Sequence, residues 1–235
     1  MKTIQSIICW TVAASFAAWV TPQALAQEEE NPDKITEQDK KTFQDAVKAL
    51  TTPSAKSRQT HAVMNARQIG LAMFEFETEY GEFPNEKTAK TVKEVTETKA
   101  EIKAVTANDC LFQLIAANIV ESDRMFSLEI PAAAEKQEKR KPLEKLAKCS
   151  FAYLTVLNAA GNPSRPLVVA PLVNGETVFD PKVLGGRAVV LRVDNSVTTI
   201  PIEKDGRVLI DGMDMFDPAQ PFWNGKVPPI KWPEQ

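Results

Sequence analysis

Three aspartates near a glycine offer the clearest metal-binding chemistry in the sequence. Asp211, Asp214 and Asp217 lie in the segment DGMDMFD, residues 211–217. Carboxylate oxygens spaced along a loop can bind calcium, so this segment predicts a calcium site. The spacing of an EF-hand is missing, and aspartates beside glycine commonly cap turns instead. Calcium is therefore the one cofactor that the sequence suggests, with turn capping as the alternative.

The cysteines allow one disulfide bond. Cys9 lies in the apolar stretch at the N-terminus, which leaves Cys110 and Cys149 for the rest of the chain. In an oxidising compartment they could pair, and closing a loop of about 40 residues would stabilise the fold by roughly 3–4 kcal/mol. Sequence does not give the distance between the two sulfurs, so two separate buried thiols are the alternative.

Several sets of catalytic residues are missing from the sequence. His61 is the only histidine, and no G-x-S-x-G sequence accompanies it, so a histidine-based nucleophilic triad is not expected. One histidine and two widely separated cysteines do not make a zinc site. Glu75, Glu77 and Glu79 occupy one predicted helix, whereas acid–base pairs usually face each other across a cleft. We therefore expect no catalytic residues and no enzymatic activity.

The first 26 residues have the pattern of a secretory signal peptide. Lys2 provides a positive start, residues 7–20 are apolar, and Ala24-Leu25-Ala26 matches the small-x-small cleavage pattern. The apolar stretch is shorter than the roughly 20 residues of a membrane span. We therefore expect cleavage before Gln27 and a periplasmic or secreted protein without stable membrane insertion.

Charge and length limit the function classes further. The chain has a formal net charge of −3 and a sequence pI near 5.4, so it has no general attraction to nucleic acid. Its expected partners are other envelope or secreted proteins. The predicted organisation is a signal peptide (1–26), a polar N-terminus with a short helix at 36–50 (27–53), and one α+β domain with a proline-rich tail (54–235).

Residues 54–80 predict one long amphipathic helix. Its apolar side chains recur every three or four residues and form a single stripe. Gly81 is a natural stop and Pro84 prevents continuation. Leu71 and Phe74 lie off the stripe, which predicts that the helix is covered on more than one side. The stripe consists of Ala62, Ala66, Ile69, Met73, Phe76 and Tyr80.

The second half of the chain predicts antiparallel strands. Residues 187–193 and 197–202 are apolar runs joined by Asp194-Asn195-Ser196, which predicts a tight hairpin. Pro171 predicts that the strand before it is an edge strand. Trp223 and Trp232 are expected to anchor a tail that wraps over the domain. Other predicted strands cover 151–157, 167–173 and 207–210, which continue the meander. Helices followed by strands favour an α+β fold.

The long helix and the hairpin together resemble the type IV pilin and type II secretion pseudopilin headgroup. The matching residues of the helix are Asn65, Arg67, Gln68, Ile69, Gly70, Leu71 and Ala72, followed by Gly81, Phe83 and Pro84. The hairpin matches at residues 192–197, with Asn195 in place of a common glycine. The resemblance implies a long N-terminal helix packed on a C-terminal antiparallel β-meander. It does not extend to the prepilin leader or the polymerisation helix.

Three functions follow as hypotheses. The first is an exported, non-enzymatic structural or protein-interaction protein with a pseudopilin-like domain, similar to exported bacterial proteins of unassigned function. The second is a periplasmic ligand-binding protein or a carboxylate-based envelope enzyme. The third is an accessory component of a type II secretion or type IV pilus-like system.

Overall fold

The structure is a computed structural model that describes residues 38, 40–44, 53–130 and 143–234. The chain divides into two compact units, Met1–Ala49 and Leu50–Gln235. In the first unit the described residues are helical, and the signal peptide predicted at 1–26 lies outside them. The description below concerns the second unit.

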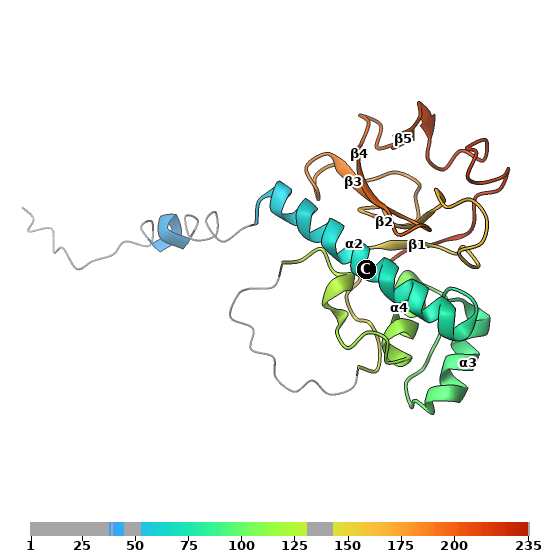
Figure 1. Cartoon of the computed structure of the whole chain (residues 1–235). Coiled ribbons are helices and arrows are strands. Elements are labelled where there is room, and N and C mark those ends of the chain that lie inside the picture. The colour runs from blue at the N-terminus through green and yellow to red at the C-terminus, as the bar shows by residue number, and fades with distance from the viewer. Residues whose placement is uncertain (1–37, 39, 45–52, 131–142, 235) are drawn as a thin grey trace, which may run out of the picture. The chain divides into compact units, whose positions relative to one another are not determined.

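The longest helix, α2, spans Ala55–Tyr80 and crosses the front of the sheet in Figure 1. It starts at Ser54, whose side chain accepts a hydrogen bond from the Ser57 amide, and it ends at Gly81 in the left-handed conformation. Most of the predicted stripe is fully buried, and only Tyr80 is partly exposed. This packing buries the inner face of α2 against the sheet and the shorter helices, and leaves its outer face exposed.

The two side chains off the stripe differ. Phe74 is partly buried and meets the Phe83 ring edge-on at 6.2 Å. Leu71 is 62% exposed, so the expectation that both would be covered was wrong for Leu71. The reason is its direction on the helix, since its face of α2 carries the exposed Met64 and Gln68 and turns away from the sheet.

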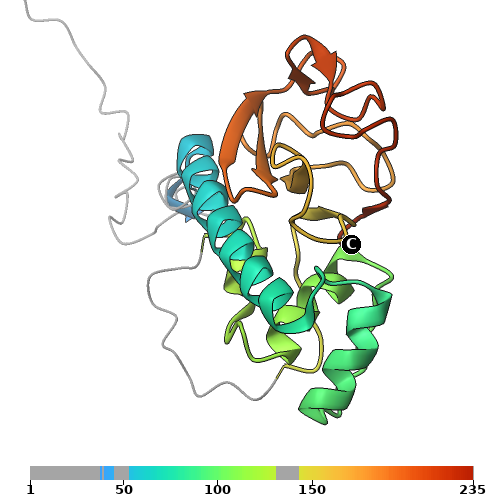
Figure 2. The same ribbon diagram turned by 45° about the vertical axis from the view of Figure 1, so that its right-hand side comes forward.

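Three shorter helical segments complete the helical layer, and Figure 2 shows them below and beside α2. Asn85 caps α3, and Thr106 caps α4. Gln113 is fully buried between these two helices, where its Oε1 accepts from Thr88 Oγ1 at 2.7 Å. The segments are α3 (Glu86–Thr96), α4 (Ala107–Ala116) and the 3-10 helix η1 (Asp123–Phe126).

The strands form one antiparallel sheet of five strands, in the order β4-β3-β2-β1-β7. The predicted α+β class with an antiparallel sheet is therefore confirmed. A second, two-stranded sheet pairs β5 with β6. The strands are β1 (Ala152–Leu154), β2 (Pro166–Ala170), β3 (Arg187–Arg192), β4 (Val197–Pro201), β5 (Leu209–Ile210), β6 (Met213–Asp214) and β7 (Ile230–Lys231).

Both faces of the sheet are covered, and alternate side chains of β3 belong to the two cores that cover them. Val189 and Leu191 belong to the core shared with α2. Ala188 and Val190 point to the opposite face and join a second core with Trp223. Because successive side chains of a strand alternate between faces, a strand covered on both sides must be apolar throughout.

Two predictions about the strands need correction. β2 is an interior strand between β1 and β3, not an edge strand. The strand ends at Ala170, so Pro171 stands just past it and its missing N–H removes no bond from the ladder. The meander also stops early, because β5 pairs with β6 in the separate sheet and only an isolated bridge joins Ile202 to Val208.

The proline-rich tail folds over the domain as predicted, and it also adds a strand. Trp223 is buried and its Nε1 donates to the Met215 carbonyl. Trp232 Nε1 donates to the Glu176 carbonyl at 3.1 Å. Between them β7 pairs with β1 at the sheet edge, a position that tolerates nearby prolines.

Within the described part of the chain, no helix is both long and apolar enough to cross a membrane.

Candidate functional site

The two segments that carry the pilin resemblance meet in the structure. Gly70 of α2 lies against the turn between β3 and β4. A Cβ atom at Gly70 would overlap the Asn195 side-chain oxygen and would stand 3.0 Å from Leu191 Cδ1. Glycine costs about 1 kcal/mol in a helix relative to alanine. Its presence here is explained by this close approach, which seats the helix on the sheet.

The hairpin turn holds its shape through its own polar groups. Asp194 Oδ1 accepts from the Ser196 amide at 2.9 Å, and the Arg192 amide donates to the Ser196 carbonyl at 2.9 Å. Asn195 adopts a φ of 62°, a conformation that asparagine tolerates better than most residues. Its side-chain oxygen is buried and has no hydrogen-bond partner among the described residues. The turn is thus held in the shape that contacts α2 at Gly70.

The structure places the three predicted calcium ligands at β6: Asp211 lies in the turn before it, Asp214 is its last residue, and Asp217 follows it. Asp214 Oδ1 accepts from the Phe216 amide and Asp217 Oδ1 from the Ala219 amide, both at 2.8 Å. These contacts are the turn-capping alternative. Asp211 is exposed. Across the described residues, no three His, Cys, Asp or Glu side chains gather closely enough to hold a metal ion.

The calcium site stays a prediction, and a melting experiment tests it. A ligand that binds only the folded state raises its stability in proportion to the logarithm of its concentration. If the loop binds calcium, millimolar calcium should raise the melting temperature and a chelator should reverse the rise. Replacing Asp211 with asparagine should remove the effect. Identical melting curves with calcium and with chelator would exclude the site.

The two cysteines are free thiols in the structure, which is the alternative to the predicted disulfide. Cys110 is buried in α4, and Cys149 Sγ donates to the Phe151 carbonyl at 3.3 Å. Burial raises the pKa of the Cys110 thiol from 9.0 to about 12, and burial likewise raises the pKa of the Cys149 thiol to about 12. Both thiols are therefore held in the protonated, poorly nucleophilic form.

These raised pKa values predict a loss of stability in alkali. Between pH 9 and about 12 the unfolded thiols lose protons that the folded ones keep, so the free energy of unfolding falls as pH rises. Below pH 9 the contribution is fully present. Urea unfolding at several pH values should show this slope, and Cys110→Ala should reduce it. Rapid labelling of both native thiols near neutral pH would contradict the assignment.

Three of the other residues considered for catalysis have separate surroundings in the structure. His61 Nδ1 lies 3.5 Å from the Asn65 side-chain nitrogen. Glu77 Oε1 accepts from the Ala159 amide at 2.7 Å and so fastens a loop to α2. Glu75 is exposed and lines a hollow of about 390 Å³ together with Glu121. Sequence reasoning missed Glu121, because no spacing pattern connects it to α2.

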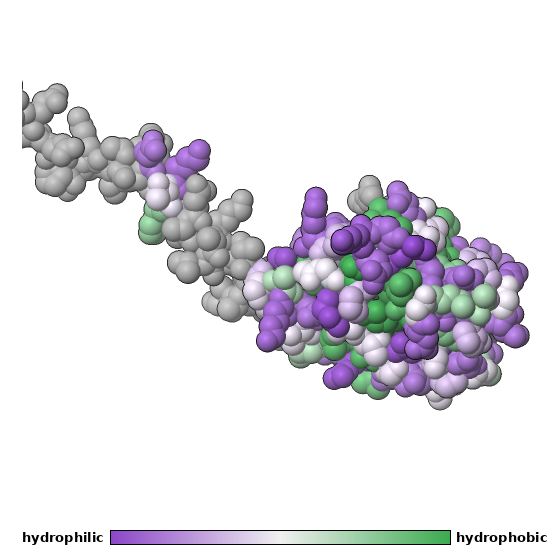
Figure 3. Space-filling model, turned by 90° about the horizontal axis from the view of Figure 1, so that it is seen from above, coloured by the Kyte–Doolittle hydropathy of each residue, from purple (hydrophilic) through white to green (hydrophobic). Residues whose placement is uncertain are grey.

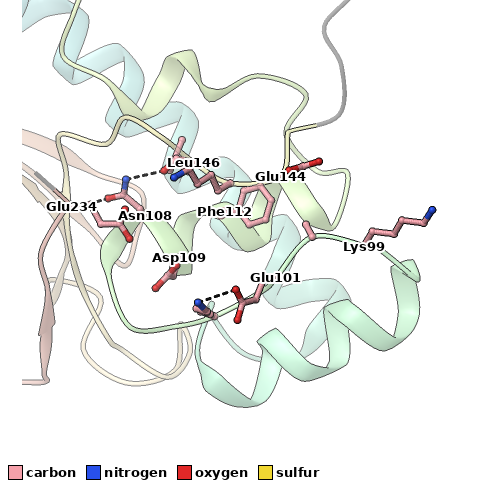
Figure 4. A pocket seen from close by; sticks show the side chains of 11 residues that line it. Lys99, Glu101, Asn108, Asp109, Phe112, Glu144, Leu146 and Glu234 are labelled. Carbon is pink, nitrogen blue, oxygen red and sulfur yellow. Dashed lines mark hydrogen bonds and ion pairs between the residues drawn. The ribbon is translucent and has the colours of Figure 1, made fainter.

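A charged cleft of about 610 Å³ lies at the start of α4 (Figure 4). Ala100, Phe112 and Leu146 form its apolar part. The cleft was not predicted, since its walls come from segments far apart in the sequence. Its charged lining residues are Lys99, Glu101, Lys103, Asp109, Glu144, Lys145 and Glu234.

Several polar groups of the cleft hold its walls together. Asn108 is buried, and its Nδ2 donates to the Leu146 carbonyl at 2.9 Å while its Oδ1 accepts from the Glu234 amide at 2.8 Å. Asp109 Oδ2 accepts from the amide of Thr106 at 3.0 Å. Asn108 therefore ties α4 to the C-terminal tail, and Asp109 caps the helix. The side chains of Asn108 and Asp109 therefore stabilise the walls of the cleft, and part of their hydrogen-bonding capacity is already used within the protein.

Comparisons with known proteins do not place this chain in a family. No family model matches it, and neither a curated protein nor a solved structure shows significant similarity to it. The function proposed below therefore rests on the residues of this chain.

Proposed function

We propose that this chain is an exported, non-enzymatic protein-interaction protein built on a pilin-headgroup-like domain. The observation that carries the proposal is the placement of α2. Its inner face is seated on the hairpin through Gly70, while Met64 and Leu71 are 55% and 62% exposed on its outer face. A contiguous exposed apolar patch favours contact with another protein, and Leu71 belongs to such a patch with the apolar residues beside it.

The surface and the sequence support the same proposal. Figure 3 views the domain from above Figure 1 and shows a mostly hydrophilic face with a hydrophobic patch in its midst, but the proposal rests on the outer face of α2. Partly buried apolar side chains of Ile119 and Met125 continue the apolar surface beside Leu71 around the 390 Å³ hollow. The signal-peptide pattern at residues 1–26 predicts export, and the resemblance at residues 65–72 and 192–197 predicts the headgroup fold.

Two experiments test this proposal. Residues 1–35 fused to an alkaline phosphatase that is active only after export should give active enzyme, and deleting residues 7–20 should abolish it. A photo-crosslinking residue at Leu71 in the full chain should yield a discrete crosslinked product in cells that express it. The matched control is Val95, which is exposed to a similar degree on α3. Export failure, or equal crosslinking from both positions, would count against the proposal.

The charged cleft favours a second candidate, a periplasmic ligand-binding protein. Both lysines and carboxylates line the cleft around Phe112, which suits a small molecule that carries both charges and an apolar part. Calorimetric titration with a set of free amino acids and dipeptides should then detect binding. Lys145→Glu should weaken it, whereas Lys204→Glu, on an exposed turn outside the cleft, should not. Absence of binding across the set would remove this candidate.

A further inference from the structure

β4 is one of the two edge strands of the five-stranded sheet, and its register shows which backbone groups face outward. At the two ends of the β3–β4 hairpin, the Arg192 amide donates to Ser196 and the Ile202 amide donates to Gly186. The register between them is unbroken, with Val189 opposite Thr199. Hydrogen-bonded pairs alternate along an antiparallel ladder. The even-numbered residues of β4 therefore bond to β3, and the backbone groups of Val197, Thr199 and Pro201 point away from it.

Some features of this outer edge favour pairing with another strand, and others oppose it. β4 has no charged residue. Its first four residues are only half-buried, and its last residue is exposed. Uncharged edge strands with unpaired backbone groups are templates for strand addition. Arg187 opposes this, because its Nη2 donates to the Thr199 carbonyl at 2.7 Å and so occupies the central outward acceptor. Pro201 lacks an N–H and removes one outward donor.

The strand is suited to pairing with itself. In an antiparallel arrangement of two copies around a two-fold axis, the strands can be centred on Thr199 or on Thr198. In both registers the Thr199 carbonyl of each copy is an acceptor of the new ladder. Neither register places like charges opposite each other, because the strand has none. Occupation of the Thr199 carbonyl by Arg187 therefore weakens both arrangements.

We propose that the outer edge of β4 is a self-association surface that pairs with β4 of a second copy, and that Arg187 holds it closed. The occupant follows from the edge itself, which offers an uncharged, self-complementary row of backbone groups. Release of Thr199 by Arg187 opens the surface. This inference does not depend on the function proposed above, since the partner is the chain itself and the surface is separate from the outer face of α2.

The test uses the chain without its signal peptide and measures its mass in solution over a wide range of concentration. Arg187→Gln is expected to associate into dimers about tenfold more tightly than the wild type, or better. Arg187→Lys keeps a charged donor beside the edge and should behave like the wild type. Adding Thr199→Pro to Arg187→Gln removes an outward N–H without removing a bond to β3, so it should restore the monomer.

A second variant makes the test independent of Arg187. Pro201→Thr restores an outward N–H while Arg187 stays in place, and it should shift the equilibrium toward dimer in the same direction. Circular dichroism establishes that each variant is folded. Dimers of Arg187→Gln that persist after Thr199→Pro would show association through another surface and overturn the proposal. So would monomeric Arg187→Gln and Pro201→Thr proteins at every concentration.

Discussion

Replacing Phe76 with alanine is expected to lower the free energy of unfolding by about 3–5 kcal/mol, the usual cost of truncating a buried phenylalanine. Phe76 is fully buried on the inner face of α2. Its ring stacks on Tyr80 with centroids 4.5 Å apart, so the variant loses both apolar contacts and an aromatic pair. A loss of this size is a large share of the 5–15 kcal/mol that holds a typical domain together. Urea unfolding followed by circular dichroism measures it.

The matched control for Phe76 lies on the same helix. Leu71 is 62% exposed, so Leu71→Ala deletes a large apolar side chain from the opposite face of α2. Alanine is at least as good a helix former as leucine, and the stability should change by no more than about 0.5 kcal/mol. Equal losses for the two variants would mean that α2 is not oriented as described.

Replacing Gly70 with alanine is expected to destabilise the domain by about 1–3 kcal/mol, the typical cost of overpacking. The helix itself would gain about 1 kcal/mol from the change, so a net loss has to come from tertiary contact. The added methyl group would overlap the Asn195 side chain and press on Leu191. Chemical unfolding of the single variant gives the size and the sign of the effect.

The contact can be isolated with a double-mutant cycle. Asn195→Gly removes the obstructing side chain and suits the φ of 62° at that position, so alone it should be nearly neutral. In that background Gly70→Ala should cost much less, because only the contact with Leu191 remains tight. A coupling energy near zero would contradict the close approach of α2 to the hairpin.

The sequence predicted the local elements well where a single physical rule decides them. The stripe from Ala62 to Phe76 is buried because helical spacing puts those side chains on one face. The hairpin at residues 194–196 formed where two apolar runs flank a short polar turn. The pilin resemblance, the signal peptide and the function remain predictions.

The sequence-based predictions were wrong or incomplete where the structure of a segment depends on its neighbours in space. Pro171 predicts an edge strand, yet β2 is interior because it pairs with both β1 and β3. The proline is tolerated because the strand stops one residue before it. β7 was not predicted, since two of the three residues between Pro229 and Pro233 become a strand only when β1 offers an edge to pair with. Leu71 looks like a core residue by type, and only the packing of α2 shows that it is exposed.

For the candidate sites, too, some properties could be predicted from the sequence and others only from the tertiary structure. The positions of the carboxylates, thiols and glycines along the chain were read directly from the sequence, and so was the class of chemistry that each could support. Whether they converge was decided by the tertiary structure. Asp214 and Asp217 cap turns, Cys110 and Cys149 remain free, and Arg187 reaches Thr199 across a strand pair. Spacing along the chain determines local geometry, but distances between segments depend on how the helices and sheet pack.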